Sequence, residues 1–325
     1  MSGIAGVSVV VCCYNSATRI RDSLMHLALQ KVPGSILWEV VVVDNSSTDG
    51  TDEAAKEFWN NCGAATPLQI VEENRPGLFY ARRTGIGAAK YEYIIFCDDD
   101  NWLCDTYVET ANKIMNTHKQ VGAAGGKIEA VTTVGLPGWW EEYKHGYAVG
   151  SQAPATGDCT DYNFLWGAGL VVRKSLMNII VNDRFPSLFT DRKGKELSSG
   201  GDSEICARLI LMGYRLWYDE GLCLKHFITA ERLSVSYREN LFKGHELTRM
   251  AMAKYYRIIN EHKLRGWLKI KRTAKLALKL LIPFGKNDNE SIKTALNAMW
   301  KLNLPVKDED TKAILQFLKY RNQPA

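Results

Sequence analysis

The sequence YIIFCDDDNW, residues 93–102, ends a run of apolar residues in three consecutive carboxylates, Asp98, Asp99 and Asp100. The run is rich in isoleucine and aromatic residues, which is typical of a buried β-strand. At roughly 5 Å and an effective dielectric constant near 20, two neighbouring carboxylates repel each other by about 3 kcal/mol. We therefore expect a cation to lie where this strand reaches the surface.

Similar apolar segments precede this one, and stretches with a helical pattern separate them. The other segments that pattern as strands are VSVVVCCYN (residues 7–15), WEVVVVDN (38–45) and LQIVEEN (68–74). Strands that are apolar throughout and alternate with helices are typical of parallel sheets covered on both faces. The sequence therefore predicts an α/β fold, Rossmann-like, with a mostly parallel sheet flanked by helices.

Polar side chains follow several of these strands at the point where each strand ends. Tyr14 and Asn15 follow the first strand, Asp44 and Asn45 end the second, and the aspartates end the fourth. Right-handed crossovers bring the carboxyl ends of parallel strands to one edge of the sheet. Ligands of open α/β sheets bind outside that edge, so these residues predict a binding site.

The aspartates can hold a metal ion at this edge. Residues i and i+2 of an extended chain face the same way, so Asp98 and Asp100 point toward one site. Mg²⁺ and Mn²⁺ accept such oxygen ligands, and Mg²⁺ usually shares one or two carboxylates with substrate phosphates. An acidic, solvated turn is the alternative, but the position beside Asp44 favours a metal ion held together with a diphosphate.

Composition narrows the class of protein. The chain has 325 residues, 46% of them hydrophobic, and a formal net charge of +5. Its eight cysteines form no CxxC pair and several lie inside apolar runs, which favours free thiols in a reducing compartment. The first apolar run has no preceding Lys or Arg, unlike a signal peptide, and no stretch approaches 18 consecutive apolar residues. We expect a cytoplasmic protein.

Four segments, in this order and spacing, resemble glycosyltransferase family 2, whose members have the GT-A fold. They are SVVVCCYN (residues 8–15), VVVDNSSTDGT (41–51), GLFYARRTGIGAAKYEYIIFCDDD (77–100) and LSSGGDSEICARLILMGY (197–214). The resemblance extends from about residue 7 to about residue 240. It implies that the first half binds a nucleotide sugar, with the base and ribose held by Tyr14, Asn15, Asp44 and Asn45.

The resemblance also implies roles on the diphosphate side of the donor. Asp98, Asp99 and Asp100 match the DxD element of the family, which bridges ribose, metal and diphosphate. Arg82 matches a basic residue on the helix before that element, near the nucleotide, although a surface arginine is the alternative. His226, at the end of LCLKHF, corresponds to a histidine that completes the metal site in many GT-A enzymes, and imidazole is a plausible ligand for Mn²⁺. A structural histidine at a strand end is the alternative.

On the acceptor side, the family places a catalytic base at the start of a helix. The segment GGDSE keeps the aspartate, Asp202, but Gly201 stands where a glutamate is usual. Asp202 is the expected base and Glu204 a weaker candidate on the acceptor side. The alternative is that Asp202 only interacts with the first-turn N–H groups, because acids favour helix N-termini. Trp166 can contact a sugar, as can two adjacent tryptophans at 139 and 140, although aromatic residues are more often part of the core.

The C-terminal part, 236–325, patterns as a helical extension of a GT-A domain at 1–235. Residues 262–286 carry eight Lys or Arg and no acid, with an apolar face along one side of the predicted helix. Such a helix can lie on an anionic membrane surface, or it can pack on the protein with a solvated basic face. Nothing else in the chain resembles a module that reads nucleic acid.

These observations predict a metal-dependent, inverting glycosyltransferase. It would move one sugar from a nucleoside-diphosphate sugar, UDP by default, to a hydroxyl of a saccharide or lipid-linked acceptor, in surface polysaccharide or glycolipid assembly. The protein would be cytoplasmic, with a peripheral position on the inner face of the membrane. Two alternatives stay open: a catalytically inactive nucleotide-sugar-binding protein and a sugar-nucleotide pyrophosphorylase. The second would need a Gly-rich basic loop after the first strand, where this chain has CCYNSATRI.

Overall fold

The computed structural model describes residues 4–181, 187–189, 200–280 and 309–321, with the side chains of 264–280 and 309 excepted. Within these residues, the main sheet has eight strands in the order β3-β2-β1-β4-β9-β6-β10-β8. Its strands are β1 (Ile4–Cys13), β2 (Trp38–Asp44), β3 (Leu68–Glu72), β4 (Tyr91–Asp98), β6 (Val121–Gly125), β8 (Gly157–Asp158), β9 (Val171–Arg173) and β10 (Arg215–Tyr218). Only β8 and β9 pair antiparallel with their neighbours, so the prediction of a mostly parallel sheet is confirmed.

A second, three-stranded sheet lies next to the end of β4. It consists of β5 (Asn101–Leu103), β11 (Leu224–Phe227) and β7 (Ile128–Val131). His226 on β11 pairs with Asn101 on β5, one residue after the acidic triplet. This small sheet therefore brings a residue more than a hundred positions away next to the aspartates.

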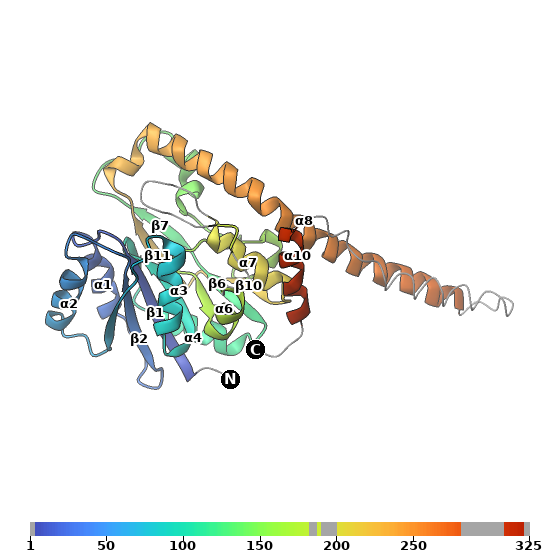
Figure 1. Cartoon of the computed structure of the whole chain (residues 1–325), viewed down its shortest axis with the longest axis horizontal. Helices are drawn as coiled ribbons and strands as arrows, with labels where there is room; N and C mark the ends of the chain where they lie inside the picture. Colours follow the sequence, from blue (N-terminus) through green and yellow to red (C-terminus); the bar gives the residue numbers. More distant parts are fainter. Residues whose placement is uncertain (1–3, 182–186, 190–199, 281–308, 322–325) are drawn as a thin grey trace.

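Helices cover both faces of the main sheet (Figure 1). The helices among the described residues are α1 (Ile20–Ala28), α2 (Thr51–Asn61), α3 (Leu78–Ala88), α4 (Tyr107–Thr117), α5 (Trp140–Tyr143), α6 (Lys174–Ile180), α7 (Gly201–Leu211), α8 (Val235–Leu280) and α10 (Glu309–Gln316). The short 3₁₀ turns in the part of the chain that the structure describes are η1 (Lys144–Tyr147), η2 (Thr160–Tyr162), η3 (Ala230–Leu233) and η4 (Phe317–Tyr320). The long helix α8 crosses the domain and continues beyond it, which confirms a helical C-terminal region.

The alternation of side chains along β1 explains the two layers. Val7, Val9 and Val11 belong to the core that contains α1, α2 and α4, whereas Val10 belongs to the core that contains α3, α6 and α7. A run of valines can serve both faces because successive side chains of a strand point to opposite sides. The second core continues into α8 and α10, so part of the C-terminal region packs on the same hydrophobic interior. None of the helices in the described part of the chain combines the length and hydrophobicity needed to cross a membrane.

Gly85 of α3, the first glycine of the segment GIGAAK, packs closely against the sheet. A Cβ atom on Gly85 would lie 2.3 Å from Cγ1 of Val10 and 3.2 Å from Cγ2 of Val43, whereas a Cβ on Gly87 would meet nothing within 4 Å. The absence of a side chain at 85 therefore lets α3 approach β1 and β2 closely. This close approach positions Arg82, one turn earlier on the same helix.

We expect Gly85→Ala to lower the free energy of unfolding by about 1–3 kcal/mol, because overpacked cores lose that much. Gly87→Ala is the matched control and should raise it by up to about 1 kcal/mol, since alanine is the better helix former. Urea unfolding followed by circular dichroism measures both. Equal effects of the two substitutions would contradict the packing explanation.

Candidate active site

A cavity of about 780 Å³ opens at the carboxyl ends of β1, β2 and β4. Its walls come from the ends of these strands, from the loop before α3, from the start of α7 and from one face of α8. The predicted site residues on its surface are Tyr14, Asn45, Arg82, Asp98, Asp99, Asp100, Trp166, Asp202 and His226. Those that do not line it are Asn15, Asp44 and Glu204.

Asn45 organises the loop that leads into α3. Its side-chain amide donates to the carbonyl oxygens of Glu73 at 2.9 Å and Arg75 at 2.7 Å, and its Oδ1 accepts from the backbone N–H of Gly77 at 2.7 Å. Tyr14 is 49% exposed at the cavity edge. Asn45 thus shapes the wall, while Tyr14 offers an aromatic face.

Asp44 and Asn15, which we expected at the nucleotide, do not line the cavity. They hold the turn after β2 instead. Oδ1 of Asp44 accepts from the backbone N–H of Ser47 at 3.2 Å, and Oδ1 of Asn15 accepts from that of Thr48 at 2.9 Å. Asn15 has a positive φ of 48°, a conformation that asparagine tolerates better than most residues. The turn after β2 is therefore tied to the end of β1.

The middle aspartate of the triplet fastens the segment after β1. Oδ2 of Asp99 accepts from Oγ of Ser16 and from Nη2 of Arg19, the latter at 2.8 Å, while Oγ of Ser23 donates to its carbonyl oxygen at 2.8 Å. Burial raises the pKa of Asp99 to about 6, the charge of Asp100 adds to this rise, and Arg19 acts in the opposite direction. Arg19 thus supplies part of the positive charge that the sequence predicts beside the acidic triplet.

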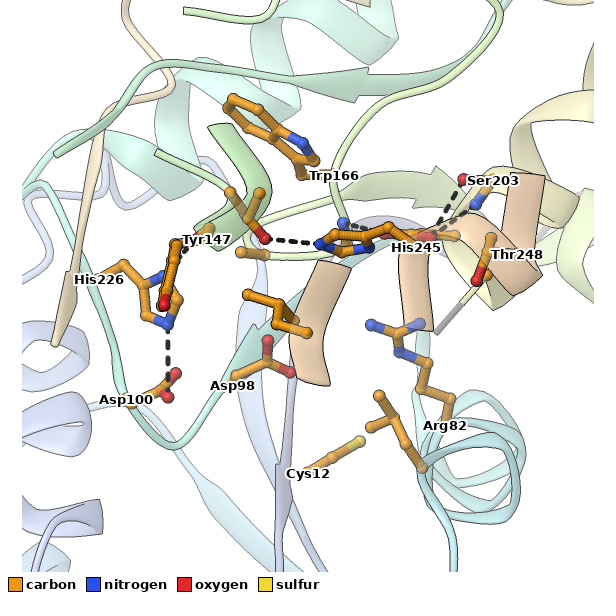
Figure 2. Close-up of a pocket in the computed structure, with 18 of the residues that line it drawn as sticks. Cys12, Arg82, Asp98, Asp100, Tyr147, Trp166, Ser203, His226, His245 and Thr248 are labelled. Carbon is orange, nitrogen blue, oxygen red and sulfur yellow. Dashed lines mark hydrogen bonds and ion pairs between the residues drawn. The ribbon is translucent and has the colours of Figure 1, made fainter. Parts of the chain in front are cut away.

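The last aspartate faces a second arginine and the predicted histidine. Oδ2 of Asp100 lies 2.8 Å from Nη1 of Arg232 and 3.5 Å from Nε2 of His226, and Figure 2 shows the imidazole directed at this carboxylate. Oδ1 of Asp100 accepts from Nδ2 of Asn101 at 2.9 Å. The sequence predicted the histidine at this position but did not predict Arg232.

The side chains at this end of the cavity are of the chemical types that bind a divalent cation. Asp98, Asp100 and His226 line the same cavity, and two carboxylates with an imidazole suit Mn²⁺ or Mg²⁺ when phosphate oxygens complete the shell. Among the described residues, no three such side chains already converge as a metal cluster. In this arrangement the guanidinium of Arg232 holds the Asp100 oxygen nearest His226.

Asp202, in the first turn of α7, lines the same cavity as the triplet. Its Oδ2 accepts from the backbone N–H of Gly167 at 2.9 Å and its Oδ1 from that of Ser203 at 2.7 Å. A Cβ on Gly167 would lie 2.6 Å from Nη2 of Arg82 and 3.4 Å from Asp202. A side chain at 167 would displace the guanidinium of Arg82, so Gly167 lets the arginine and the carboxylate lie close to each other.

Glu204 lies in a buried network behind α7. Its Oε1 accepts from OH of Tyr255 at 2.9 Å and from Nη2 of Arg208 at 3.0 Å, and Nε of Arg208 donates to OH of Tyr255 at 2.9 Å. Because Tyr255 belongs to α8, this network joins α8 to α7. Glu204 is only 3% exposed, so the structure gives it a role in packing two cavity walls together.

The aromatic residues separate into two groups. Trp166 lines the cavity and Figure 2 shows it at the rim, with the ring of His145 6.1 Å away. Trp140 is buried and packs with Trp139 and Tyr147, their ring centroids 5.1–6.3 Å apart; Tyr147 lines the cavity, whereas the two tryptophans do not. Trp166 alone among the three tryptophans is placed to touch a substrate.

The wall supplied by α8 was missed by sequence reasoning, which treated this region as a separate extension. The α8 residues that line the cavity are Leu241, His245, Thr248, Arg249, Met252 and Tyr256. His245 is fixed through Nε2, which lies 2.9 Å from the carbonyl oxygen of Gly146, and Figure 2 shows it facing the cavity beside Thr248. The spacing of these residues follows one face of a helix, but it carries no signal that distinguishes a cavity wall from a core face.

Comparison with known proteins agrees with this geometry. Residues 8–168 match the family model described as "Glycosyl transferase family 2". The chain is 34% identical over 126 residues to "Glycosyltransferase AglE" of Haloferax volcanii, a match that covers 38% of this chain and 39% of that protein. It is 33% identical over 107 residues to "Glycosyltransferase GlyA" of Streptococcus pneumoniae, covering 33% of this chain and 14% of that protein. The chain thus matches well under half the length of these relatives.

Solved structures agree on the fold. The structure of residues 1–349 of TarS from S. aureus in complex with UDP-GlcNAc is 22% identical, with a TM-score of 0.52, and covers 76% of this chain and 66% of that chain. The corresponding complex with UDP has a TM-score of 0.50 at 21% identity, covering 76% and 65%. These similarities confirm the GT-A fold class, with the mostly parallel sheet flanked by helices.

Proposed function

Because the chain belongs to glycosyl transferase family 2 through residues 8–168, we propose that it moves one sugar from a nucleoside-diphosphate sugar to an acceptor hydroxyl. The observation that supports this most is that one cavity carries acidic residues at the sheet edge and Asp202 on the facing helix. A donor diphosphate at the first position would place its sugar toward the second. The volume of about 780 Å³ is within the range of substrate-binding sites.

On the donor side, Asp98, Asp100 and His226 would hold a divalent cation. When bound, such an ion neutralises charge on the leaving diphosphate. Arg82 lies at the cavity wall 5.2 Å above the ring of Phe96 and contributes positive charge on the same side. Tyr14 would stack on the base, and the loop fixed by Asn45 would border the ribose.

On the acceptor side, Asp202 would take the proton from the attacking hydroxyl. Its Oδ2 is oriented by the N–H of Gly167, so the carboxylate keeps one direction toward the cavity. The oxygen of the acceptor attacks the anomeric carbon as the bond to the diphosphate breaks on the opposite face. One carboxylate on the acceptor side, without a second as nucleophile, favours a single displacement with inversion.

We infer UDP as the donor nucleotide and a saccharide or lipid-linked acceptor. TarS structures carry UDP or UDP-GlcNAc, which supports a uridine donor. Among the relatives, one is named a poly(ribitol-phosphate) β-N-acetylglucosaminyltransferase, with 31% identity over 111 residues, and another a cholesterol galactosyltransferase, with 28% identity over 103 residues. By name, one acts on a polymer and the other on a lipid, which supports a role in surface polysaccharide or glycolipid assembly.

UDP release and thermal unfolding together distinguish a transferase from a protein that only binds the donor. We expect the protein to release UDP from a UDP-sugar slowly with water and faster with an acceptor, in the presence of Mn²⁺, and to be stabilised by UDP in thermal unfolding. Stabilisation without any turnover would favour the catalytically inactive binding protein. Formation of a nucleotide sugar from a sugar phosphate and UTP would favour the pyrophosphorylase instead.

We also propose that residues 262–286 attach the protein to an anionic membrane surface on the cytoplasmic side. Helix α8 continues through 280, and 281–286 lie outside the described residues. We expect the full-length protein to float with vesicles that contain an anionic phospholipid and not with neutral ones. Flotation should be lost when four basic residues become glutamine: Lys269, Arg272, Lys275 and Lys279.

A matched control removes the same amount of charge elsewhere. Glutamine replaces four exposed lysines on other parts of the protein: Lys56, Lys113, Lys119 and Lys225. Net charge falls equally in both variants, so only the position of the charge differs. Equal flotation of the two variants would contradict the membrane proposal.

A further inference from the structure

Three side chains from two distant parts of the chain meet at one position in the cavity. Nη1 of Arg232 lies 2.8 Å from Oδ2 of Asp100 and 3.3 Å from Nε2 of His226, while that Oδ2 and Nε2 are themselves 3.5 Å apart. All three residues line the cavity. A carboxylate and an imidazole therefore share a single cationic nitrogen.

The other ring nitrogen of His226 determines what Nε2 offers. Nδ1 lies 3.0 Å from the carbonyl oxygen of Tyr147, and a carbonyl only accepts, so Nδ1 carries the proton and donates. In the neutral ring Nε2 then presents a lone pair. Oδ2 of Asp100 and Nε2 of His226 are thus two electron-pair donors aimed at the same point, which is the arrangement that a divalent ion requires.

Arg232 is held in this position by its surroundings. Its Nε donates to OH of Tyr237 at 3.1 Å, and its carbonyl oxygen accepts from OH of Tyr147 at 3.0 Å. The side chain is only 16% exposed. An arginine fixed from both its backbone and its side chain is a built component of the site and not a surface residue that happens to reach it.

We propose that Arg232 and the divalent cation compete for Asp100 and His226, so that the guanidinium occupies the cation position until the metal displaces it. The proposal rests on the proposed function, because the metal ion belongs to the donor complex. A diphosphate favours the exchange, since the ion carries two charges against one and binds phosphate oxygens as well. Arg232 therefore makes metal binding weak in the free protein and dependent on the nucleotide.

The test is a titration with Mn²⁺ followed by electron paramagnetic resonance, with and without UDP. We expect Arg232→Met to bind Mn²⁺ without UDP about 5- to 150-fold more tightly than the wild type, the usual range of coupling between two binding events. Arg19→Met is the matched control, because it removes the arginine on Asp99; it should change the affinity less than about threefold. Arg232→Lys keeps a charge within reach of Asp100 and should stay near the wild type.

Thermal unfolding of each variant checks that it is folded, and Arg232→Gln replaces the methionine variant if that one is not. Equal or weaker Mn²⁺ binding by the neutral variants, with nucleotide-dependent binding intact, would overturn the competition alone. Absence of Mn²⁺ binding in every protein, even with UDP, would overturn both the competition and the metal site of the proposed function. An equal gain in Arg19→Met and Arg232→Met would assign the effect to overall charge and also overturn the proposal.

Discussion

Replacing Asp202 by asparagine is expected to lower the rate of sugar transfer by about 10²- to 10⁴-fold, the usual contribution of a general base. Donor binding should persist, because the proposed metal ligands Asp98, Asp100 and His226 are unchanged in this variant. The amide oxygen of asparagine can still accept from the N–H of Gly167, as Oδ2 of Asp202 does at 2.9 Å, but its amide nitrogen cannot accept from the N–H of Ser203. The contact with Gly167 is thus kept while the basicity of the side chain is lost.

The same variant decides between a base and a helix cap. Asparagine caps helices about as well as aspartate, so a purely structural Asp202 would leave the rate of transfer near that of the wild type. Steady-state kinetics with a UDP-sugar and calorimetric titration of UDP give the two quantities. Transfer by Asp202→Asn at the rate of the wild type would exclude Asp202 as the base.

The second large effect is expected from Asp100→Ala. We expect the affinity for UDP in the presence of Mn²⁺ to fall by about 100-fold or more, because even residues that only support a metal ligand account for 10- to 100-fold. The affinity that remains should no longer respond to EDTA. Isothermal titration calorimetry with and without Mn²⁺ measures both.

The matched control is the neighbouring residue of the same triplet. Asp99 bonds to Ser16 and to Arg19, so Asp99→Asn should lower stability but keep the response of UDP binding to Mn²⁺. If Asp99→Asn abolished that response and Asp100→Ala preserved it, the assignment of the two carboxylates would be reversed. A response preserved in both variants would place the metal elsewhere.

The sequence predicts much of the fold because the signals are local. The valine runs of β1 and β2 can only be strands buried on both faces, and the helices between them lead to a parallel sheet. The position of the cavity follows from the same rule, since the carboxyl ends of such strands share an edge. Tyr14, Asn45 and the aspartates could therefore be placed there without coordinates.

The remaining features depend on contacts between distant residues, which have no local signature. Arg232 reaches Asp100 across 132 positions, and the pairing of β11 with β5 that brings His226 near is equally remote. The α8 wall has the pattern of an ordinary amphipathic helix. For Glu204 a local signal was present but pointed to the wrong surroundings. Its position in the first turn of α7 suggested the acceptor side, whereas its side chain pairs with Arg208, one turn later on the same helix.

The division of the chain at residue 235 stays a prediction. Helix α8 begins at Val235 and packs on the domain that precedes it. Its residues Met252, Tyr255 and Ile259 belong to the same hydrophobic core as α7. A helix that supplies both core and cavity wall is coupled to the domain before it. The proposed membrane segment at 262–286 lies beyond those packed residues.

The most direct measurement is a crystal structure of the protein with UDP and Mn²⁺. The account predicts that the ion contacts Asp100 together with the diphosphate, that the uracil lies toward Tyr14, and that the sugar end of the ligand faces Asp202. A ligand bound outside this cavity, with Asp98 and Asp100 contacting neither ion nor phosphate, would contradict it.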